Sequence, residues 1–416
     1  MGNREDFMTK FEKISRRIQS FRDDMIDLQV RLCAQPAISP LAGGEGEVKK
    51  AEVLLDFIKS LPCEQVLVIK APDLDAPAGF RPNILAFFPG KNPRRTVWVM
   101  THMDVVPPGD LSQWKGDPFK AWVEGGKIYG RGVEDNQQDM VASLFAIKAF
   151  LAENITPASN IGLALVADEE TGSSKGIDYI LRNSNHFRKN DLIIVPDAGN
   201  KEGSLIEVAE KGILWLKFRT VGKQAHASTP QKGVNAFKAA CFLVTELDGL
   251  YEAFQDKDPL FEPPFSTFEP TKKEANVPNI NTIPGEDVFY LDSRLLPKYS
   301  IDEVEKKIKA IIRKVEARFG VKITFEEQQR AAAAPPTSAQ AEVVAALRAA
   351  IRDVYGVEAK PRGIGGGTVA AIFRRAGFEA ACWSRIEETA HQPNEYCRID
   401  NMIGDAHVFA HVFLHE

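Results

Sequence analysis

The run TVWVMTHMDVV at residues 96–106 decides the fold class of this chain. Its first five residues are nearly all apolar, and His102 and Asp104 follow them closely. Short apolar runs of this kind are typical of strands buried on both faces, as in a parallel sheet covered by helices. Three more runs share the pattern, and each lies near a helix-like segment: Ile161–Ala167, Leu192–Val195 and Ala380–Trp383. Their alternation with helices predicts an α/β domain with a mainly parallel central sheet flanked by helices.

The middle of the chain predicts a second, smaller domain of α+β type. Its strand-like segments alternate apolar and polar residues, whereas its helix-like segments repeat apolar residues at helical spacing. Ser300 and Glu303 form an S-x-x-E capping box, which indicates where the second helix begins. The chain has room for one more strand before Asn281. The other expected elements, in chain order, are Gly212–Arg219, the helix Asn235–Phe254, Asp287–Leu295, the helix from Ser300 and Val321–Phe325.

The domain boundaries follow from these patterns. Residues 1–211 are expected to form the first part of the larger domain, 212–330 the inserted domain, and 331–416 the second part of the larger domain. The stretch AAAAPP at 331–336 would link the inserted domain back to the first. Near the N-terminus, apolar residues from Phe11 to Leu32 recur every three or four positions and predict an amphipathic helix.

Composition excludes several classes of function. The 416 residues include 52 Lys and Arg against 57 Asp and Glu, a net charge of −5, which argues against broad nucleic-acid binding. The five cysteines are scattered without a CxxC pair, so zinc fingers, iron–sulfur proteins and disulfide-stapled scaffolds are poor interpretations. The chain has no run of about 20 apolar residues that could span a membrane, and the charged N-terminus lacks the apolar core of a secretory signal. We therefore expect a cytoplasmic protein.

Residue types that bind metal ions collect where the predicted strands end. Because ligands in open α/β sheets bind beyond the carboxyl ends of the strands, these side chains are expected to meet there. Zinc accepts imidazole and carboxylate ligands, and hydrolases with two metals often hold them about 3.5–4 Å apart. The candidates come from five places in the chain, including the GRGVEDN turn before the helix-like stretch Met140–Leu151: His102, Asp104, Asp135, Glu169, Glu170, Asp197 and His391.

Neighbouring candidates predict separate roles. His102 and Asp104 face the same side if the strand continues through them, so Asp104 can orient the imidazole. Glu169 and Glu170 are adjacent and cannot point the same way, so one can hold a metal while the other faces water as general base. Taken alone, the two glutamates would be a solvated acidic loop, and isolated aspartates often form turns or helix caps.

Five motifs, in this order, give the chain a resemblance to a known family: HMDVV, GRGVEDN, DEETGS, PDAG and AHQPNE. Together they resemble the zinc-dependent amidohydrolase/peptidase family of succinyl-diaminopimelate desuccinylase, acetylornithine deacetylase, aminoacylase and glutamate carboxypeptidase. The resemblance covers nearly the whole chain, including the middle domain. It implies a zinc-peptidase-like catalytic domain, an inserted ferredoxin-like dimerisation or lid domain, a small-molecule substrate and a homodimer.

The resemblance also implies a role for each metal-site candidate. Two residues would hold each zinc and a fifth would bridge both ions: His102 with Asp197, Glu170 with His391, and Asp135 as the bridge, followed by a cis peptide bond. Glu169 would be the general base and acid, and Asp104 would orient His102. One or two Zn²⁺ ions per subunit are expected, with Co²⁺ or Mn²⁺ as substitutes.

The middle domain carries further candidates. His226 in GKQAHAST resembles the family histidine that enters a neighbouring subunit's active site and stabilises the tetrahedral oxyanion. Asn281 in NTIPGE and Arg294 in LDSRLLP resemble residues that contact substrate, and the fork of an arginine suits a carboxylate. For Arg294, an ordinary surface ion pair is an equal alternative.

A glycine run near the C-terminal part of the chain is a candidate anion site. It precedes a helix-like stretch, so its backbone N–H groups could hold an anion, and it comprises Gly365, Gly366, Gly367 and Thr368. The better-known amino-acid deacylases have an acidic residue shortly after this run, where this chain continues Val369-Ala370-Ala371. This departure leaves the exact substrate open.

Together these features predict a metal-dependent hydrolase of amino-acid metabolism. It would cleave the amide bond of an N-acyl amino acid with metal-activated water, and Glu169 would be the general base. The alternative within the family is a peptidase that acts on dipeptides or oligopeptides. Outside it, the alternatives are a noncatalytic small-molecule binder and a two-metal phosphoesterase.

Three other patterns carry no separate function. The run GIGGGT departs from GxGxxG and does not predict a dinucleotide site. The stripe of His407, His411 and His415 is expected to be a packed or surface helix face. Neither Cys382 nor Cys397 has the motif of a catalytic nucleophile.

Overall fold

The chain forms two compact units in the computed structural model, which describes residues 2–415. The large unit contains the chain up to Val208, Thr337–Pro361 and the chain from Thr368 onward. The small unit contains Ala209–Pro336 and Arg362–Gly367, so the glycines at 365–367 belong to it.

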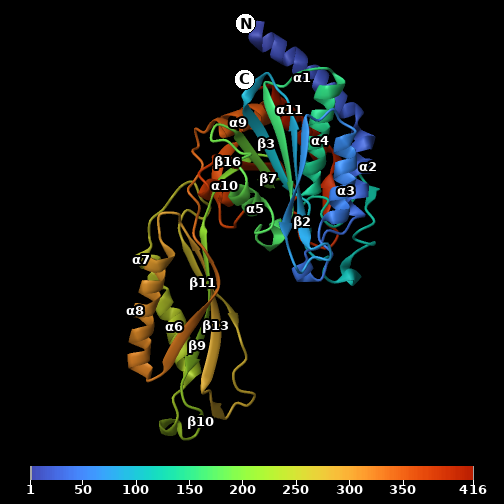
Figure 1. The fold of residues 1–416 in the computed structure, drawn as a ribbon. Helices are drawn as coiled ribbons and strands as arrows, with labels where there is room; N and C mark the ends of the chain where they lie inside the picture. The colour runs from blue at the N-terminus through green and yellow to red at the C-terminus, as the bar shows by residue number, and fades with distance from the viewer. Residues whose placement is uncertain (1, 416) are drawn as a thin grey trace. The chain divides into compact units, whose positions relative to one another are not determined.

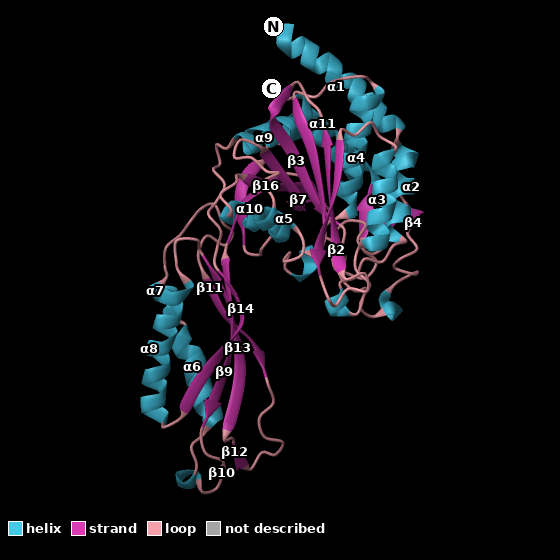
Figure 2. Ribbon diagram, in the orientation of Figure 1, coloured by secondary structure: helices cyan, strands magenta, loops and turns pink. Residues whose placement is uncertain are grey.

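An eight-stranded sheet forms the centre of the large unit, in the order β1-β2-β6-β3-β7-β16-β8-β15 (Figure 1, Figure 2). Strand β3 pairs in parallel with β6 and β7, and β7 pairs in parallel with β16. The pairs β1–β2, β2–β6 and β8–β16 are antiparallel. The four parallel strands contain the four apolar runs, and the predicted α/β sheet is confirmed. The bounds are β1 (Gln65–Pro72), β2 (Phe80–Phe88), β3 (Asn92–His102), β6 (Ser159–Val166), β7 (Leu192–Asn200), β8 (Leu205–Glu210), β15 (Lys360–Ile364) and β16 (Ala380–Arg385).

Helices cover this sheet. Helices α4 and α11 are buried along nearly their whole length. This agrees with their sequences, in which apolar residues occur on all sides of the helix instead of forming a single stripe. The bounds are α1 (Gly2–Ser20), α2 (Arg22–Cys33), α3 (Val48–Lys59), α4 (Gln137–Ala152), α5 (Ile177–Asn183), α9 (Glu342–Tyr355), α10 (Ala370–Arg375) and α11 (Ile399–Leu414). A separate three-stranded sheet has the order β17-β5-β4, with β4 (Trp122–Glu124), β5 (Lys127–Tyr129) and β17 (Tyr396–Arg398).

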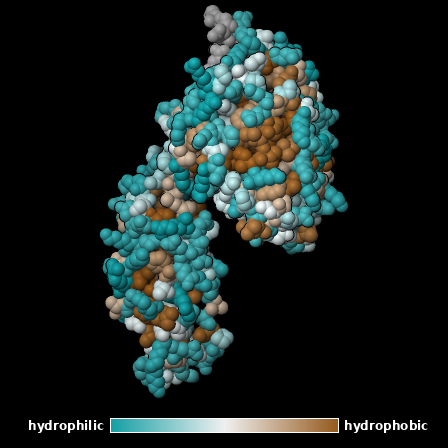
Figure 3. Space-filling view, viewed as in Figure 1, coloured by the Kyte–Doolittle hydropathy of each residue, from teal (hydrophilic) through white to brown (hydrophobic). Residues whose placement is uncertain are grey.

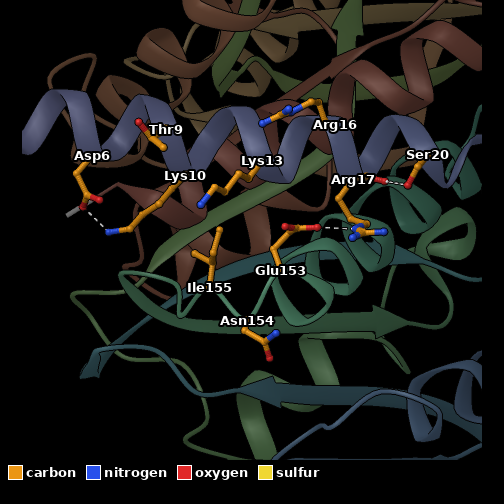
Figure 4. Close-up of a pocket in the computed structure, with 10 residues that line it drawn as sticks. All are labelled: Asp6, Thr9, Lys10, Lys13, Arg16, Arg17, Ser20, Glu153, Asn154 and Ile155. Atoms are coloured by element: carbon orange, nitrogen blue, oxygen red, sulfur yellow. Dashed lines mark hydrogen bonds and ion pairs between the residues drawn. The ribbon is translucent and has the colours of Figure 1, made fainter.

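The N-terminal helix differs from its prediction as one continuous element. The chain breaks at Phe21 between α1 and α2, and the ring of Phe21 packs edge-on against Phe145 of α4 with 5.7 Å between centroids. Local spacing does not encode this tertiary contact. On the polar face of α1, Lys10 pairs with Asp6, and Arg17 Nε lies 2.6 Å from Glu153 Oε1 (Figure 4).

The histidine stripe at the C-terminus serves packing, as predicted. His411 Nε2 on α11 lies 3.2 Å from Asp353 Oδ2 on α9, and His407 Nε2 lies 3.2 Å from the carbonyl oxygen of Ser15 on α1. Two of the three histidines therefore connect α11 to neighbouring helices.

Apolar residues of the large unit surround the central strands. The core on one side of the sheet includes Trp98, Met100, Ile193, Val195 and Phe373. Figure 3 shows hydrophobic surface over the strands of this unit. No helix in the described part of the chain is both long enough and apolar enough to cross a membrane.

The small unit has a four-stranded antiparallel sheet in the order β11-β13-β9-β14. Leucine and isoleucine side chains of α6 and α8 pack with residues of this sheet to form the core of the unit. Strand β11 is the additional strand that the spacing before Asn281 allowed, and the predicted capping box of Ser300 and Glu303 is present. The predicted helix Asn235–Phe254 is divided into α6 and α7. The bounds are β9 (Gly212–Val221), β10 (Ala225–His226), α6 (Ala236–Leu247), α7 (Gly249–Ala253), β11 (Thr267–Lys273), β12 (Thr282–Ile283), β13 (Glu286–Leu295), α8 (Ile301–Phe319) and β14 (Lys322–Ala331).

Candidate metal centre

Strand ends and loops of the large unit bring the metal-site candidates together. His102 ends β3, Asp197 lies in β7, and the short helix Glu169–Thr171 follows β6. Asp135 lies in the turn before α4, and His391 lies in the loop between β16 and β17. Among the described residues, two overlapping groups have potential ligand atoms within 4.8 Å of one another: His102 with Asp135 and Glu170, and His102 with Glu169 and Asp197.

Asp135 lies between two imidazoles. Its Oδ1 is 2.9 Å from His102 Nε2, and its Oδ2 is 3.2 Å from His391 Nε2. The peptide bond after Asp135 is cis. A carboxylate whose two oxygens face separate imidazoles is suited to bridging two ions.

The remaining ligand candidates divide between the two imidazoles. Asp197 Oδ1 lies 3.3 Å from His102 Nε2, and Glu170 Oε2 lies 3.1 Å from His391 Nε2. The side chain of His102 is fully buried, whereas that of His391 is 54% exposed. One end of the cluster is therefore enclosed and the other is open to solvent.

Asp104 supports the site in two ways. Its carboxylate oxygens accept the backbone N–H groups of Glu169 and Glu170, each at 3.0 Å. The acceptor nearest to His102 Nδ1 is the carbonyl oxygen of Asp104, at 3.1 Å, while its carboxylate lies 3.6 Å away. Both the backbone carbonyl and the carboxylate of Asp104 therefore face Nδ1 and can orient the imidazole. A proton on Nδ1 leaves the Nε2 lone pair facing Asp135.

The environment of three carboxylates in the cluster disfavours their ionised form. Burial raises the pKa of Glu169 well above its ordinary value, and it also raises the pKa of Glu170 and of Asp197. Removing a carboxylate from water and placing it beside other carboxylates disfavours the charged form. A divalent cation would offset this charge, and the mixed set of imidazoles and carboxylates fits zinc or a similar ion.

The imidazoles act in the opposite direction on Asp135. Burial by itself would raise the pKa of Asp135, but hydrogen bonds with His102 and His391 outweigh it and lower that pKa. In turn, the hydrogen bonds from His391 to Asp135 and Glu170 raise the pKa of His391 to about 10. The two imidazoles partly neutralise the acidic cluster.

The sequence did not reveal a buried ion pair next to the turn that carries Glu169 and Glu170. Arg81 Nε donates to Glu47 Oε2 at 2.6 Å, and Arg81 Nη1 lies 3.4 Å from Asp168 Oδ1. Asp168 has a φ of 65°, in the left-handed region, and its Oδ2 accepts the N–H of Lys175 at 2.9 Å. Asp168 begins the DEETGS motif, but Arg81 and Glu47 lie in segments without any motif.

Other missed residues lie inside the motifs. Asn136 Nδ2 donates to the carbonyl oxygen of Pro196 at 2.6 Å and lies 3.3 Å from Asp197 Oδ1. Its position directly after Asp135 in GRGVEDN was an available signal. Glu134 of the same motif and Glu395, the last residue of AHQPNE, are both buried acids. Burial raises the pKa of Glu395 to about 7.

In the small unit, His226 is exposed at the end of β10. The backbone N–H of Ser228 donates to His226 Nδ1 at 3.1 Å. Because that nitrogen accepts, the neutral ring carries its proton on Nε2, which becomes a hydrogen-bond donor. The side chain of Asn279 donates to the Oδ1 of Asn281.

Arg294 already has partners within the small unit. Its Nε and Nη2 lie 2.7 and 3.0 Å from the two carboxylate oxygens of Asp292, and its Nη1 donates to the carbonyl oxygen of Gly365 at 3.0 Å. The guanidinium therefore forms the ion pair that was the alternative to substrate contact. In the glycine run, Gly366 and Gly367 are exposed, and the following helix α10 has only six residues.

Cys382 and Cys397 have the environment of structural cysteines. Both are buried in the large unit, and burial raises the pKa of each thiol well above its ordinary value. A buried, protonated thiol is a poor nucleophile, which agrees with the prediction.

Comparisons with known proteins support the interpretation of this cluster as a metal centre. The sequence matches peptidase family M20/M25/M40 over residues 98–415. An uncharacterized metallohydrolase of Methanocaldococcus jannaschii is 40% identical, over 93% of this chain and 98% of its own length. Succinyl-diaminopimelate desuccinylase of Alkalilimnicola ehrlichii is 28% identical, over 71% of this chain and 77% of its own. The structure of human carnosine dipeptidase 1 has a TM-score of 0.74 at 19% identity and covers 97% of this chain and 98% of that chain.

The fold and the site together define a metallohydrolase with an α/β unit and a separate α+β unit. The chain belongs to peptidase family M20/M25/M40, which confirms the resemblance drawn from the five motifs. It is a hydrolase that acts on C–N bonds.

Proposed function

We propose that this chain is a zinc-dependent, cytoplasmic enzyme of amino-acid metabolism that hydrolyses the amide bond of an N-acyl amino acid. The observation that carries the proposal is the position of Asp135, with one oxygen 2.9 Å from His102 and the other 3.2 Å from His391. This geometry supports one or two ions, the first held by His102 and Asp197 and the second by Glu170 and His391. Co²⁺ or Mn²⁺ would substitute for Zn²⁺.

Divalent ions at this site would supply Lewis acidity, which makes a carbonyl carbon more electrophilic and a water molecule more acidic. Glu169 would then take a proton from the attacking water and return it to the leaving nitrogen. Its backbone N–H is held by Asp104, which also holds the N–H of Glu170. The two glutamates therefore start from fixed positions, as a ligand beside a proton carrier requires.

The substrate would carry a free carboxylate beside its amide bond. The desuccinylase relative supports an N-acyl amino acid. We assign substrate contact to Arg294, Asn281 and the glycine run with Thr368, where Arg294 would exchange its contact with Asp292 for the substrate carboxylate. In an arginine–carboxylate pair, two parallel N–H···O bonds fix the orientation of the ligand.

The small unit is proposed as a lid and dimerisation domain in a homodimer. His226 would donate from Nε2 to the oxyanion in the active site of the neighbouring subunit. The contact between Ser228 N–H and His226 Nδ1 supports this role, because it leaves the proton on Nε2.

A peptidase that acts on dipeptides or oligopeptides is the second candidate. It is favoured by Val369-Ala370-Ala371, which replaces the acidic residue that follows the glycine run in the better-known amino-acid deacylases.

A substrate panel separates the two. N-succinyl and N-acetyl amino acids and unmodified dipeptides would be incubated with metal-free protein, before and after addition of Zn²⁺ or Co²⁺. We expect hydrolysis of N-acyl amino acids only after metal is added. Hydrolysis of dipeptides alone would contradict the deacylase proposal, and turnover that is insensitive to metal removal would contradict the metal mechanism.

A further inference from the structure

Two buried carboxylates clamp together the segments that carry Asp135 and His391. Glu395, from the second segment, accepts four N–H donors of the first. Its Oε2 is 2.6 Å from Arg131 Nη1 and 3.1 Å from the backbone nitrogen of Gly132. Its Oε1 is 3.0 Å from the nitrogen of Glu134 and 3.2 Å from the nitrogen of Asp135 itself.

Glu134 makes the reciprocal contacts from the first segment to the second. Its Oε1 accepts the N–H of Glu387, and its Oε2 lies 2.5 Å from Thr389 N and 2.8 Å from Thr389 Oγ1. Arg131 adds a bond from Nη2 to the carbonyl oxygen of His391, at 3.3 Å. The clamp, defined as Arg131, Glu134 and Glu395, therefore contacts the backbone of both residues that face each other across the outer end of the metal centre.

Burial makes these contacts obligatory. Arg131, Glu134 and Glu395 are exposed by only 2, 3 and 1%. A buried carboxylate that loses its donors bears the cost of desolvation, so each carboxylate holds its partner segment in place. The segments are also joined where β5 and β17 pair antiparallel, just outside the clamp.

The clamp serves only part of the ligand set. His391 and Asp135 lie on its two segments, whereas Glu170 is positioned from the other side by Asp104. His102 and Asp197 belong to β3 and β7 of the central sheet. A change in the clamp should therefore alter the His391 end of the site most, because the His102 end shares only Asp135 with the clamped segments and keeps His102 and Asp197 on the central sheet.

We propose that Arg131, Glu134 and Glu395 are positioning residues that fix the separation of Asp135 and His391 and thereby set the affinity of the second metal ion. This inference rests on the proposed two-ion site. None of the three residues needs to touch substrate or metal. Residues that orient metal ligands typically change metal affinity by about 10–100-fold when they are replaced.

The test measures the binding of Zn²⁺ to metal-free Glu395→Gln. A chelator competes for the metal and fixes the free Zn²⁺ concentration, and metal analysis after equilibration gives the amount bound. The variant keeps the shape of the side chain but places an amide against N–H donors. We expect one of the two affinities to fall by about 10–100-fold and the other to stay within about threefold of the wild type.

Asp191→Asn is the matched control. Asp191 is another buried carboxylate of the large unit, and it accepts three N–H groups, from Thr96 at 2.9 Å, Trp98 Nε1 at 3.0 Å and Arg188 at 2.8 Å. It lies at the start of β7, away from the strand ends that carry the ligands. This variant should lose stability but bind both ions as the wild type does.

Thr389→Val provides a milder change if Glu395→Gln does not fold. It removes the hydroxyl bond to Glu134 and the hydroxyl's contacts with the backbone of Tyr396, but keeps the backbone bond from Thr389 to Glu134. It should weaken the affinity for the second ion by a smaller factor. Unchanged binding of both ions in the folded clamp variants, or an equal loss in Asp191→Asn, would overturn the inference. A wild-type protein that binds no ion would instead overturn the proposed function, and this inference with it.

Discussion

The candidate residues of the large unit and those of the small unit are held in different ways. In the large unit, Asp135 contacts His102 and His391, which are distant from it in sequence. In the small unit, each candidate has a partner two residues away: His226 with Ser228, Asn281 with Asn279, and Arg294 with Asp292. The first group is a product of tertiary structure, whereas the second is organised mainly by near neighbours, with one distant bond from Arg294 to Gly365.

The difference has a consequence for catalysis. Residues fixed by many distant contacts are positioned before substrate arrives, and such preorganisation is a main source of catalytic power. In the proposed function, the small-unit candidates would act only when substrate or another subunit reaches them. Substitutions in the large unit should therefore remove the chemistry of the chain's own site. Those in the small unit should alter substrate binding or, for His226, the kcat of a site shared with another subunit.

The largest expected effect is that of Glu169→Gln. Because a general base contributes about 10²–10⁴-fold, we expect turnover to fall by about 10³-fold with metal content unchanged. Steady-state kinetics and metal analysis on the same preparation measure both. Glu52→Gln, at an exposed position of α3, is the control and should behave as the wild type. Normal turnover in Glu169→Gln would remove Glu169 from the mechanism.

His226→Ala should have the next largest effect, because loss of an oxyanion donor typically costs about 10²–10³-fold in kcat. Ser228→Ala, which keeps the backbone donor to Nδ1, should retain most activity. Mixing His226→Ala chains with Glu169→Gln chains should restore activity, since one hybrid site would have both residues intact. Absence of recovery in verified hybrids would show that the site is not shared between subunits.

Asp405, a buried acid of the large unit outside the metal centre, leads to a prediction about the pH dependence of stability. Burial raises the pKa of Asp405 to about 7, and its Oδ1 accepts from the Tyr355 hydroxyl at 2.9 Å. A carboxyl whose pKa is raised on folding stabilises the protein at low pH, and this contribution is lost as pH rises from about 4 through 7. Wild type should therefore lose stability relative to Asp405→Asn as pH rises from 5 to 7.

Chemical denaturation at several pH values measures this difference. Asp302→Asn, at an exposed position of the small unit, should keep the pH dependence of the wild type. Parallel profiles for wild type and Asp405→Asn would contradict the assignment of the pH dependence to Asp405.

The smallest expected effect belongs to Arg294→Ala. We expect KM to rise by about fivefold while kcat stays within about threefold, because one partly exposed charged contact is worth about 1 kcal/mol. Asp292→Asn keeps the guanidinium and releases it from its partner, so KM should stay the same or fall. An unchanged KM in Arg294→Ala would assign this residue to the ion pair with Asp292 alone.

Much of the fold followed from local patterns, and the exceptions have identifiable causes. The four apolar runs became the four parallel strands because a strand buried on both faces needs apolar residues at nearly every position. The break at Phe21 was missed because the helical spacing of the flanking residues continues through it, while the contact with Phe145 is distant in sequence. The division of Asn235–Phe254 into α6 and α7 was missed for the same reason, since apolar spacing continues across Asp248.

In the candidate site, too, some residues could be predicted from the sequence and others could not. Most of the seven metal-site candidates could be named because they lie at or near the ends of parallel strands, where the backbone of the sheet brings side chains to one edge. Asp135, in the turn before α4, and His391, in the loop after β16, were named from their motifs. Arg81 and Glu47 could not be named, since a buried ion pair has no local pattern and its members come from separate segments. Glu134 and Glu395 were visible within motifs, but their reciprocal contacts were not.

By itself, the sequence determined the class of the fold, the membership of the family and the residue types available for chemistry, because these depend on periodicity and on short motifs. The tertiary structure alone decided which atoms meet: Asp135 between two imidazoles, the carbonyl oxygen of Asp104 at His102, and the clamp across two segments. The physical reason is that hydrogen bonds and burial act through space, over separations in sequence that no local pattern records.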